Sequence, residues 1–378
     1  MIYLDYSATT PVDKRVLESF NKVCEEYIGN ANSIHELGDK SKELMDKATI
    51  QVANLLGVKK HEIIFTSGAT ESNNLAIKGI VEKYNNRGKH IITTNIEHSS
   101  ISEVMKFFEK KGYEISYVDV DSDGIVKIDH LKKLLRKDTI LVSICYVNSE
   151  VGIRQPIEEI GKILKEYPLT LFHVDATQAI GKISINVDNI DLMSFSAHKF
   201  FGLKGVGVLM RKENIDLEPL FHGGESQSAY RSGTPSLPLY VSLAKSLRLI
   251  LEDIDNNYNY VLELNKKLKK EFSKYKDIVI NSSDKCIPHI LNISLLNIKP
   301  ETFVNAMSKH NIYISTKTAC SSKNELSKTL LAMNKDRNIV LSSIRISLSY
   351  KTTIEEINAF LKFFDLEFKV LNNIIGEK

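Results

Sequence analysis

Short apolar runs alternate with helical patterns between about residues 60 and 210, and this alternation constrains the fold more than any other feature. The runs are EIIFT, HIITTN, TILVSICYVN, TLFHVDA and DLMSFSA, and GVGVLMR follows as the expected closing strand. Strands that are apolar at nearly every position are typical of parallel sheets, because helices cover both faces of such sheets. The alternation therefore predicts an α/β fold with a mostly parallel central sheet.

Helical patterns lie on both sides of this region. Amphipathic helices are expected over 12–27 and 40–56, and a glycine that can end the helix follows each of them. Helical patterns also dominate from Pro238 to about Tyr275. A smaller α+β part follows, with CIPHILNIS and SSIRISLS as strands and TIEEINAFLKFFDLEF as the last helix.

The length of the chain allows one large and one smaller core. It has 378 residues, of which 43% are hydrophobic, and chains of this size commonly divide into domains. We expect a large domain over 14–252. We expect residues 1–13 to join 253–378 in a small C-terminal domain.

Charge and cysteine content exclude several classes of protein. With 50 Lys and Arg against 47 Asp and Glu, the net charge of +3 gives no sign of direct nucleic-acid binding. The start, MIYLDYSATTPVD, is not typical of a signal peptide, and no apolar stretch is long enough to span a membrane. The four cysteines are far apart and have no zinc-ribbon spacing, which suits a reducing compartment. We therefore expect a cytoplasmic protein without a metal site.

Polar residues follow the predicted strands at the edge of the sheet where such folds bind ligands. FTSGATESNN is a strand, a glycine turn and a helix start, whose free amide groups can bind an anion together with the hydroxyl of Thr70. It lacks the Gly-Lys-Ser/Thr of a P-loop. Asp175, Lys199 and His98 stand at the ends of three other strands.

Each of these features also has an ordinary interpretation. The glycine turn and the aspartate can cap helices, the lysine can reach solvent, and a single histidine is usually structural. Together, however, an anion site, a carboxylate and an amine match the phosphate, the ring nitrogen and the aldehyde of pyridoxal phosphate. A dinucleotide would need G-x-G-x-x-G after the first strand, which neither SGATES nor GLKGVG supplies.

Nine motifs in order, from Tyr3 to about Ile357, resemble those of the cysteine desulfurases, the NifS/IscS-like group of class V aminotransferases. They are YLDYSATTP, SGATESNN, EHSS, VNSEVGIRQPI, HVDATQAIGK, SFSAHKFFGLKGVGVL, RSGTPS, TACSS and SIRISLS. The resemblance implies the aspartate aminotransferase-like fold (type I) of pyridoxal-phosphate-dependent transferases, and a homodimer. It also implies conversion of L-cysteine to L-alanine, with the sulfur passed to an acceptor protein for iron–sulfur clusters or tRNA thiolation.

The resemblance also implies roles for single residues in the cofactor site. Lys199 matches the lysine that forms the Schiff base and moves protons, and Asp175 matches the partner of the ring nitrogen. Gln178 matches the contact to the phenolic oxygen, and His98 the residue stacked on the ring. The remaining implied contacts are cofactor ligands in the turns, and they are Ala69, Thr70, Ser196, His198 and, from the neighbouring subunit, Thr234.

Asn148 and Arg345 match the residues that hold the substrate carboxylate, and Cys320 matches the cysteine that forms a persulfide. Cys320 lies in a polar stretch with Lys317 three residues before it, and a nearby cation can favour the thiolate. The other three cysteines fit small apolar positions. The family's usual Ser-Gly-Ser before Ala-Cys is here TKT, and the stretch before RSGT reads HGGESQSAY. Because of these changes, the sequence does not identify the protein that accepts the sulfur.

Other functions remain to be distinguished. A selenocysteine lyase or an aminotransferase can share the fold, although an aminotransferase has no need of Cys320. A sulfur-relay or scaffold protein with an inactive site is a third possibility, against which Lys199, Asp175 and Arg345 argue because all three are present.

Overall fold

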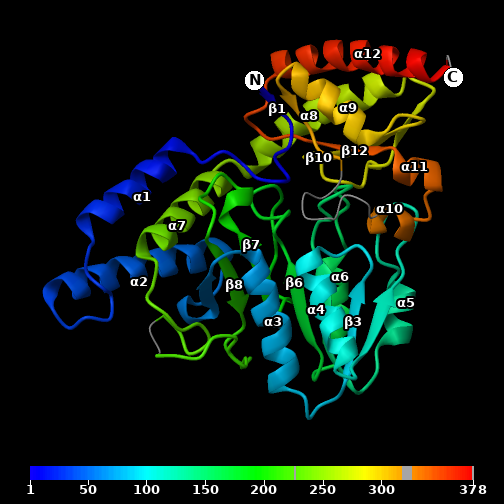
Figure 1. Cartoon of the computed structure of the whole chain (residues 1–378). Coiled ribbons are helices and arrows are strands. Elements are labelled where there is room, and N and C mark those ends of the chain that lie inside the picture. Colours follow the sequence, from blue (N-terminus) through cyan, green and yellow to red (C-terminus); the bar gives the residue numbers. More distant parts are fainter. Residues whose placement is uncertain (225–226, 317–325, 377–378) are drawn as a thin grey trace.

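A seven-stranded sheet forms the centre of the computed structural model, which describes residues 1–224, 227–316 and 326–376 (Figure 1). The order of its strands is β2-β8-β7-β6-β5-β3-β4. The strands are β2 (Ile63–Thr66), β3 (His90–Thr94), β4 (Glu114–Val118), β5 (Thr139–Cys145), β6 (Leu171–Asp175), β7 (Leu192–Ser196) and β8 (Gly207–Arg211). The prediction of an α/β fold with a mostly parallel sheet is confirmed.

Strand β8 alone runs against its neighbours in this sheet, antiparallel to both β2 and β7. All other pairs are parallel. GVGVLMR therefore does not close the sheet at an edge but lies inside it. Because β2 and β7 flank β8, they point the same way, and β2, β3, β5, β6 and β7 all end at one edge of the sheet.

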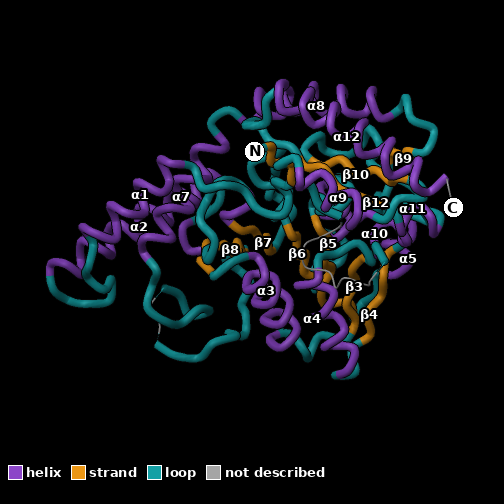
Figure 2. The backbone as a smooth tube through the Cα atoms, turned by 45° about the horizontal axis from the view of Figure 1, so that its top comes forward, coloured by secondary structure: helices purple, strands orange, loops and turns teal. Residues whose placement is uncertain are grey.

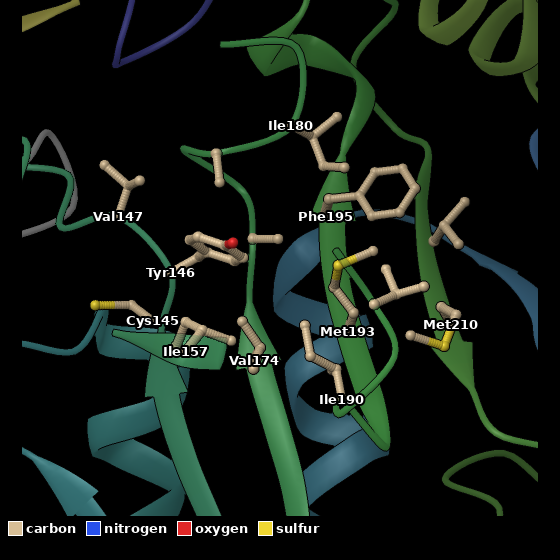
Figure 3. Close-up of a cluster of buried hydrophobic side chains, with 14 of the residues drawn as sticks. Cys145, Tyr146, Val147, Ile157, Val174, Ile180, Ile190, Met193, Phe195 and Met210 are labelled. Carbon is tan, nitrogen blue, oxygen red and sulfur yellow. The ribbon is translucent and has the colours of Figure 1, made fainter. Parts of the chain in front are cut away.

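Helices cover both faces of this sheet, as Figure 2 shows. Leu192 of β7 joins a cluster under the helices α3 and α4, whereas Met193 and Phe195 face a second cluster, part of which Figure 3 shows. The first seven helices are α1 (Lys14–Glu26), α2 (Glu36–Leu56), α3 (Ala69–Lys83), α4 (Ser99–Lys110), α5 (Ile128–Leu134), α6 (Ile157–Leu164) and α7 (Leu237–Leu251). As predicted, α2 ends at a glycine, Gly57, in left-handed conformation.

A smaller group of elements lies at one end of the large sheet (Figure 1). Its antiparallel sheet has the order β12-β10-β9, and β1 pairs with β11 in parallel. The strands are β1 (Ile2–Tyr3), β9 (Ile278–Ile280), β10 (Ile290–Leu295), β11 (Ile312–Tyr313) and β12 (Ser343–Ser347). The helices are α8 (Ile254–Phe272), α9 (Pro300–Lys309), α10 (Lys328–Ala332), α11 (Arg337–Leu341) and α12 (Ile354–Gly376).

A separate apolar cluster holds this smaller group together. It includes Leu4 from the N-terminal segment, Phe303 of α9 and Phe364 of α12. The N-terminal segment therefore packs with elements from the other end of the chain. The domain boundaries named from the sequence stay a prediction. Among the described helices, none has the length and apolar character needed to cross a membrane.

Truncation of Phe303 tests the importance of this second cluster. The side chain is fully buried and its ring lies 5.0 Å from that of Phe364, centroid to centroid. We expect Phe303→Ala to lower the free energy of unfolding by about 3–5 kcal/mol, because it leaves a cavity. Phe107→Ala, at a side chain that is 40% exposed, should cost less than about 1 kcal/mol. Urea denaturation measures both, and equal losses would contradict the packing described.

Candidate active site

A cavity of about 530 Å³ opens at the edge where the parallel strands end. The N-terminal segment forms one wall and β12 contributes Arg345. Nine of the residues that the sequence singled out line it, namely Ala69, Thr70, His98, Asp175, Gln178, Ser196, His198, Lys199 and Arg345. The structure thus brings together most of the predicted site from turns that are far apart in the sequence.

The glycine turn after β2 has the shape of an anion cradle. Gly68 has a φ of 154° and precedes the first turn of α3, whose amide groups have no acceptor within the helix. Gly207 of β8 passes so close that a Cβ atom on it would lie 2.7 Å from Cα of Gly68. Thr70 and Ser196 line the cavity beside this turn. Amides, hydroxyls and a helix N-terminus together suit a phosphate group.

Asp175 ends β6 as a buried acceptor that is already oriented. Its Oδ2 accepts a hydrogen bond of 2.9 Å from Asn73 Nδ2, and its Oδ1 accepts one of 2.9 Å from the amide of Thr177. A carboxylate fixed in this way can face a protonated ring nitrogen. This donor set fits pyridoxal phosphate, whose pyridine nitrogen needs such a partner.

Asn73 was not recognised from the sequence. Its Nδ2 also donates to Ser100 Oγ at 2.9 Å, which in turn lies 2.9 Å from Nδ1 of His98. It therefore links the carboxylate of Asp175 to the imidazole. Its spacing could have identified it, because Asn73 stands one helical turn after Ala69 in SGATESNN and lies on the same face of the helix.

His98 presents a neutral ring to the cavity. It caps α4, and its Nδ1 accepts a hydrogen bond of 3.2 Å from the amide of Ser100. Burial lowers the pKa of His98, and although Asp175 opposes this, Lys199 adds to it. A neutral aromatic ring in the wall of the cavity suits contact with the face of another ring.

His198 is neutral as well. Burial, together with the nearby cations Lys199, Lys204 and Lys182, lowers the pKa of His198 to about 4. Its Nδ1 lies 3.1 Å from Oγ1 of Thr9. A neutral imidazole keeps one N–H donor, so His198 can donate to a phosphate oxygen without a charge of its own.

Lys199 follows β7 and turns its amine toward the N-terminal segment. Its Nζ donates to the backbone oxygens of Ser7 and Ala8 at 2.7 and 2.8 Å. These two contacts come from residues about 190 positions away in the sequence, and sequence reasoning did not identify them. They hold the amine within the cavity, where it can react with an aldehyde.

Arg345 supplies a buried guanidinium. Its side chain is 1% exposed, Nη2 donates to Asp5 Oδ1 at 2.9 Å, and Nη1 donates to the backbone oxygen of Ser149 at 3.0 Å. Its Nε is buried and has no partner in the described part of the chain. The guanidinium therefore keeps free N–H donors, and it can bind a carboxylate through paired hydrogen bonds.

Asn148 does not line the cavity. Its Nδ2 donates to the backbone oxygen of Ile96 and to Oγ1 of Thr329, and its Oδ1 accepts from the amides of Glu150 and Val151. The amide group is therefore fully used within the protein. The following residue, Ser149, lines the cavity instead. The role of Asn148 as a substrate ligand stays a prediction.

Another predicted cofactor ligand lies elsewhere. Thr234 lines a second cavity of about 530 Å³, together with residues 31–34, Asp39 and Lys42. Cys320 and Lys317 lie outside the described residues. Within the described ranges, no group of three or more His, Cys, Asp or Glu side chains is placed to hold a metal ion.

Cys145, read from the sequence as a small apolar residue, lines the cavity at the end of β5. Burial raises the pKa of the Cys145 thiol well above its usual value, and the neighbouring carboxylates of Glu97 and Asp175 add to this. The thiol therefore stays protonated and is a poor nucleophile.

Comparisons with known proteins agree with the geometry. The family model for class V aminotransferases matches residues 2–360. The chain is 39% identical to cysteine desulfurase IscS of Dictyoglomus turgidum, over 99% of this chain and 96% of that protein. It is 42% identical to a NifS/IcsS protein homolog of Lactobacillus delbrueckii subsp. bulgaricus, over the full length of both.

Solved structures show the same likeness. The structure of a NifS-like protein matches with a TM-score of 0.93 at 40% identity, covering 98% of this chain and 100% of that one. A NifS-like protein from Rickettsia africae matches with a TM-score of 0.88 at 32% identity, covering 98% and 99% of the two chains.

The contact between Gly207 and the glycine turn gives a direct test of the anion cradle. In Gly207→Ala the new Cβ atom must displace the backbone of Gly68, and such overpacking costs about 1–3 kcal/mol. We expect the affinity of the apoprotein for pyridoxal phosphate, measured by absorbance titration, to fall about tenfold or more. Gly224→Ala, where a Cβ atom meets nothing within 4 Å, should bind as the unaltered protein does. If both variants bind alike, the phosphate lies elsewhere.

Proposed function

The chain belongs to the class V aminotransferase family, among its NifS/IscS-like cysteine desulfurases, and from this premise we propose how its residues carry out the reaction. The observation that carries the proposal is the cavity that unites four groups from separate turns. Lys199 offers an amine, Asp175 a carboxylate, the turn at Gly68 an anion cradle, and Arg345 a guanidinium. L-cysteine is the proposed substrate and L-alanine the product.

Pyridoxal phosphate is the proposed cofactor. When bound, it supplies an electron-withdrawing ring that makes the α-proton of the substrate acidic and allows the sulfur on Cβ to leave. Asp175 would hold the proton on the ring nitrogen, His98 would lie against the ring, and Gln178 would contact the ring oxygen. The phosphate would be held by Ala69, Thr70, Ser196 and His198.

Lys199 would remove the α-proton of the substrate and return a proton later. Its amine donates to two backbone oxygens, which orient its N–H groups. In the neutral amine the lone pair is the group that would take the proton. Arg345 would bind the substrate carboxylate and so fix the α-carbon relative to Lys199. The positioning of one atom against another is itself a large part of catalysis.

Cys320 is the proposed acceptor of the sulfur. Its thiolate attacks the sulfur of the substrate, so that an S–S bond forms while the bond between Cβ and sulfur breaks. The enzyme keeps the sulfur as a persulfide, and the carbon skeleton gains a proton at Cβ and leaves as L-alanine. The persulfide sulfur would then pass to an acceptor protein for iron–sulfur cluster assembly or tRNA thiolation.

A homodimer fits the surface around Thr234. Ile34 is fully exposed in the loop between α1 and α2, Ile28 is 76% exposed, and Phe221 is 54% exposed. Large apolar side chains that gather at a surface indicate a protein contact. We propose that a second copy covers this region and that Thr234 completes the phosphate site of the partner, in the cytoplasm.

A paired assay of Cys320→Ala tests the proposed function. The purified protein and the variant should both be yellow with bound pyridoxal phosphate. With a thiol reductant, the unaltered protein should release alanine and sulfide from L-cysteine. The variant should release alanine and sulfide at a rate at least about 100-fold lower, as expected when a nucleophile is removed.

Cys24→Ala is the matched control, because Cys24 is an exposed cysteine on α1, and its activity should be unchanged. Undiminished sulfide release by Cys320→Ala would contradict the persulfide mechanism and favour a lyase. Formation of a keto acid instead of alanine would favour an aminotransferase.

A further inference from the structure

Lys182 is a buried amine without a buried counter-ion. Its side chain lies in the interior, 7% exposed, and its Nζ donates to Oε1 of Gln178 at 3.1 Å. Within the part of the chain that the structure describes, no carboxylate pairs with it. Burial, together with the charge of Lys199, lowers the pKa of Lys182 to about 7. To bury an amine in this way is costly for stability, so its position calls for another explanation.

The local backbone places Lys182 against Gln178. The amide of Ile180 donates to the oxygen of Ala176, and the amide of Ile183 donates to that of Ala179. The segment is a run of turns and not a helix, because the amide of Lys182 donates to the oxygen of Ala179 and Gly181 has a φ of 74°. This folded segment brings the side chain of Lys182 to that of Gln178. The contact between the two side chains is therefore built into the turn that follows β6.

A very small cavity of about 20 Å³ lies next to the amine, with room for about one water molecule. Besides Lys182, the titratable residues that line it are Tyr6, Lys199, His289 and Tyr350. Burial lowers the pKa of His289 to about 3, so this histidine is neutral, and its Nδ1 has no partner among the described residues. His198 is neutral as well and also senses the charge of Lys182. None of these groups offers the amine an anion.

The orientation of the Gln178 amide is set by a hydrogen-bond donor on one side and an acceptor on the other. In its charged form Lys182 Nζ can only donate, and the amide turns its oxygen toward it. The backbone oxygen of Ser7 can only accept, and it receives a hydrogen bond of 2.8 Å from Nε2 of Gln178. Nε2 keeps a second N–H, and Gln178 lines the active-site cavity.

We propose that Lys182 is a positioning residue that holds the amide of Gln178 so that its nitrogen, and not its oxygen, faces the ring oxygen of the cofactor. The inference rests on the proposed function. Without the donor at residue 182, only the backbone oxygen of Ser7 favours this orientation, so the amide turns over more readily and sets its oxygen against the ring oxygen. Two acceptors would then face each other, and cofactor binding would weaken.

A double-mutant cycle on the apoprotein tests this coupling. The probe is pyridoxamine phosphate, which keeps the ring oxygen but cannot form a Schiff base with Lys199, and fluorescence titration gives its affinity. Lys182→Met and Gln178→Leu should each weaken binding about tenfold, as expected for the loss of one hydrogen bond in a site. The double variant should bind no more weakly than either single one, because both substitutions remove the same interaction.

Thermal unfolding of the apoprotein separates this role from a structural one. Lys182→Met replaces a buried amine by an apolar chain, so the unfolding temperature should stay the same or rise. A lysine that only supports the fold would give a lower unfolding temperature when replaced. Lys162→Met, at an exposed lysine of α6, is the control and should change neither affinity nor stability.

The outcomes distinguish a failure of the proposed cofactor from a failure of the positioning role of Lys182. If the unaltered apoprotein binds no pyridoxamine phosphate, the proposed cofactor is wrong. If it binds while the losses of Lys182→Met and Gln178→Leu add up in the double variant, Lys182 does not act through Gln178. Unchanged binding by Gln178→Leu alone overturns the positioning role as well, whether or not Lys182→Met folds.

Discussion

The common direction of six strands, all but β8, is the constraint on which the site depends. Because β2, β3, β5, β6 and β7 all end at one edge, the turns that follow them meet there. Asn73 and Asp175 are 102 positions apart in the sequence and still share a hydrogen bond of 2.9 Å. Apolar clusters under helices occupy both faces of the sheet, so polar side chains and ligands are left with its edge.

The N-terminal segment completes this edge. Leu4 belongs to the apolar cluster of the C-terminal elements, while Asp5 pairs with Arg345. A few residues later, Ser7 and Ala8 accept hydrogen bonds from Lys199. One short stretch therefore fixes both the group proposed to bind the substrate carboxylate and the reactive amine. Any movement of the C-terminal elements relative to the large sheet therefore shifts Arg345 and Lys199 relative to each other through these contacts.

The sequence predicted well what depends on local pattern and less well what depends on tertiary placement. Apolar alternation identified most strands, and their ends carried His98, Asp175 and Lys199 into one cavity. It missed β4, which has only one fully buried residue and so lacks a continuous apolar run. It named GVGVLMR as the closing strand, whereas β8 lies between β2 and β7, because strand order cannot be read from apolarity.

Polar residues whose roles arise from distant partners were harder to interpret. Asn148 has the residue type of a substrate ligand, but the fold uses its amide in a turn and at Thr329. Lys182 looks like a surface lysine in the string AIGKIS, and only the packing of its turn shows that it is buried.

The charges around the cavity explain why such a site needs its ligands. Lys199, Lys204 and Arg345 line it, and the pKa shifts keep His98 and His198 neutral. Asp5 pairs with Arg345, and Glu71 of the lining pairs with Arg231, so Asp175 is the carboxylate of the lining that is left to compensate Lys199 and Lys204. A phosphate and a substrate carboxylate supply the missing negative charge. Their binding therefore stabilises the folded state as well as preparing the reaction, because a ligand that binds only the folded state shifts the unfolding equilibrium toward it.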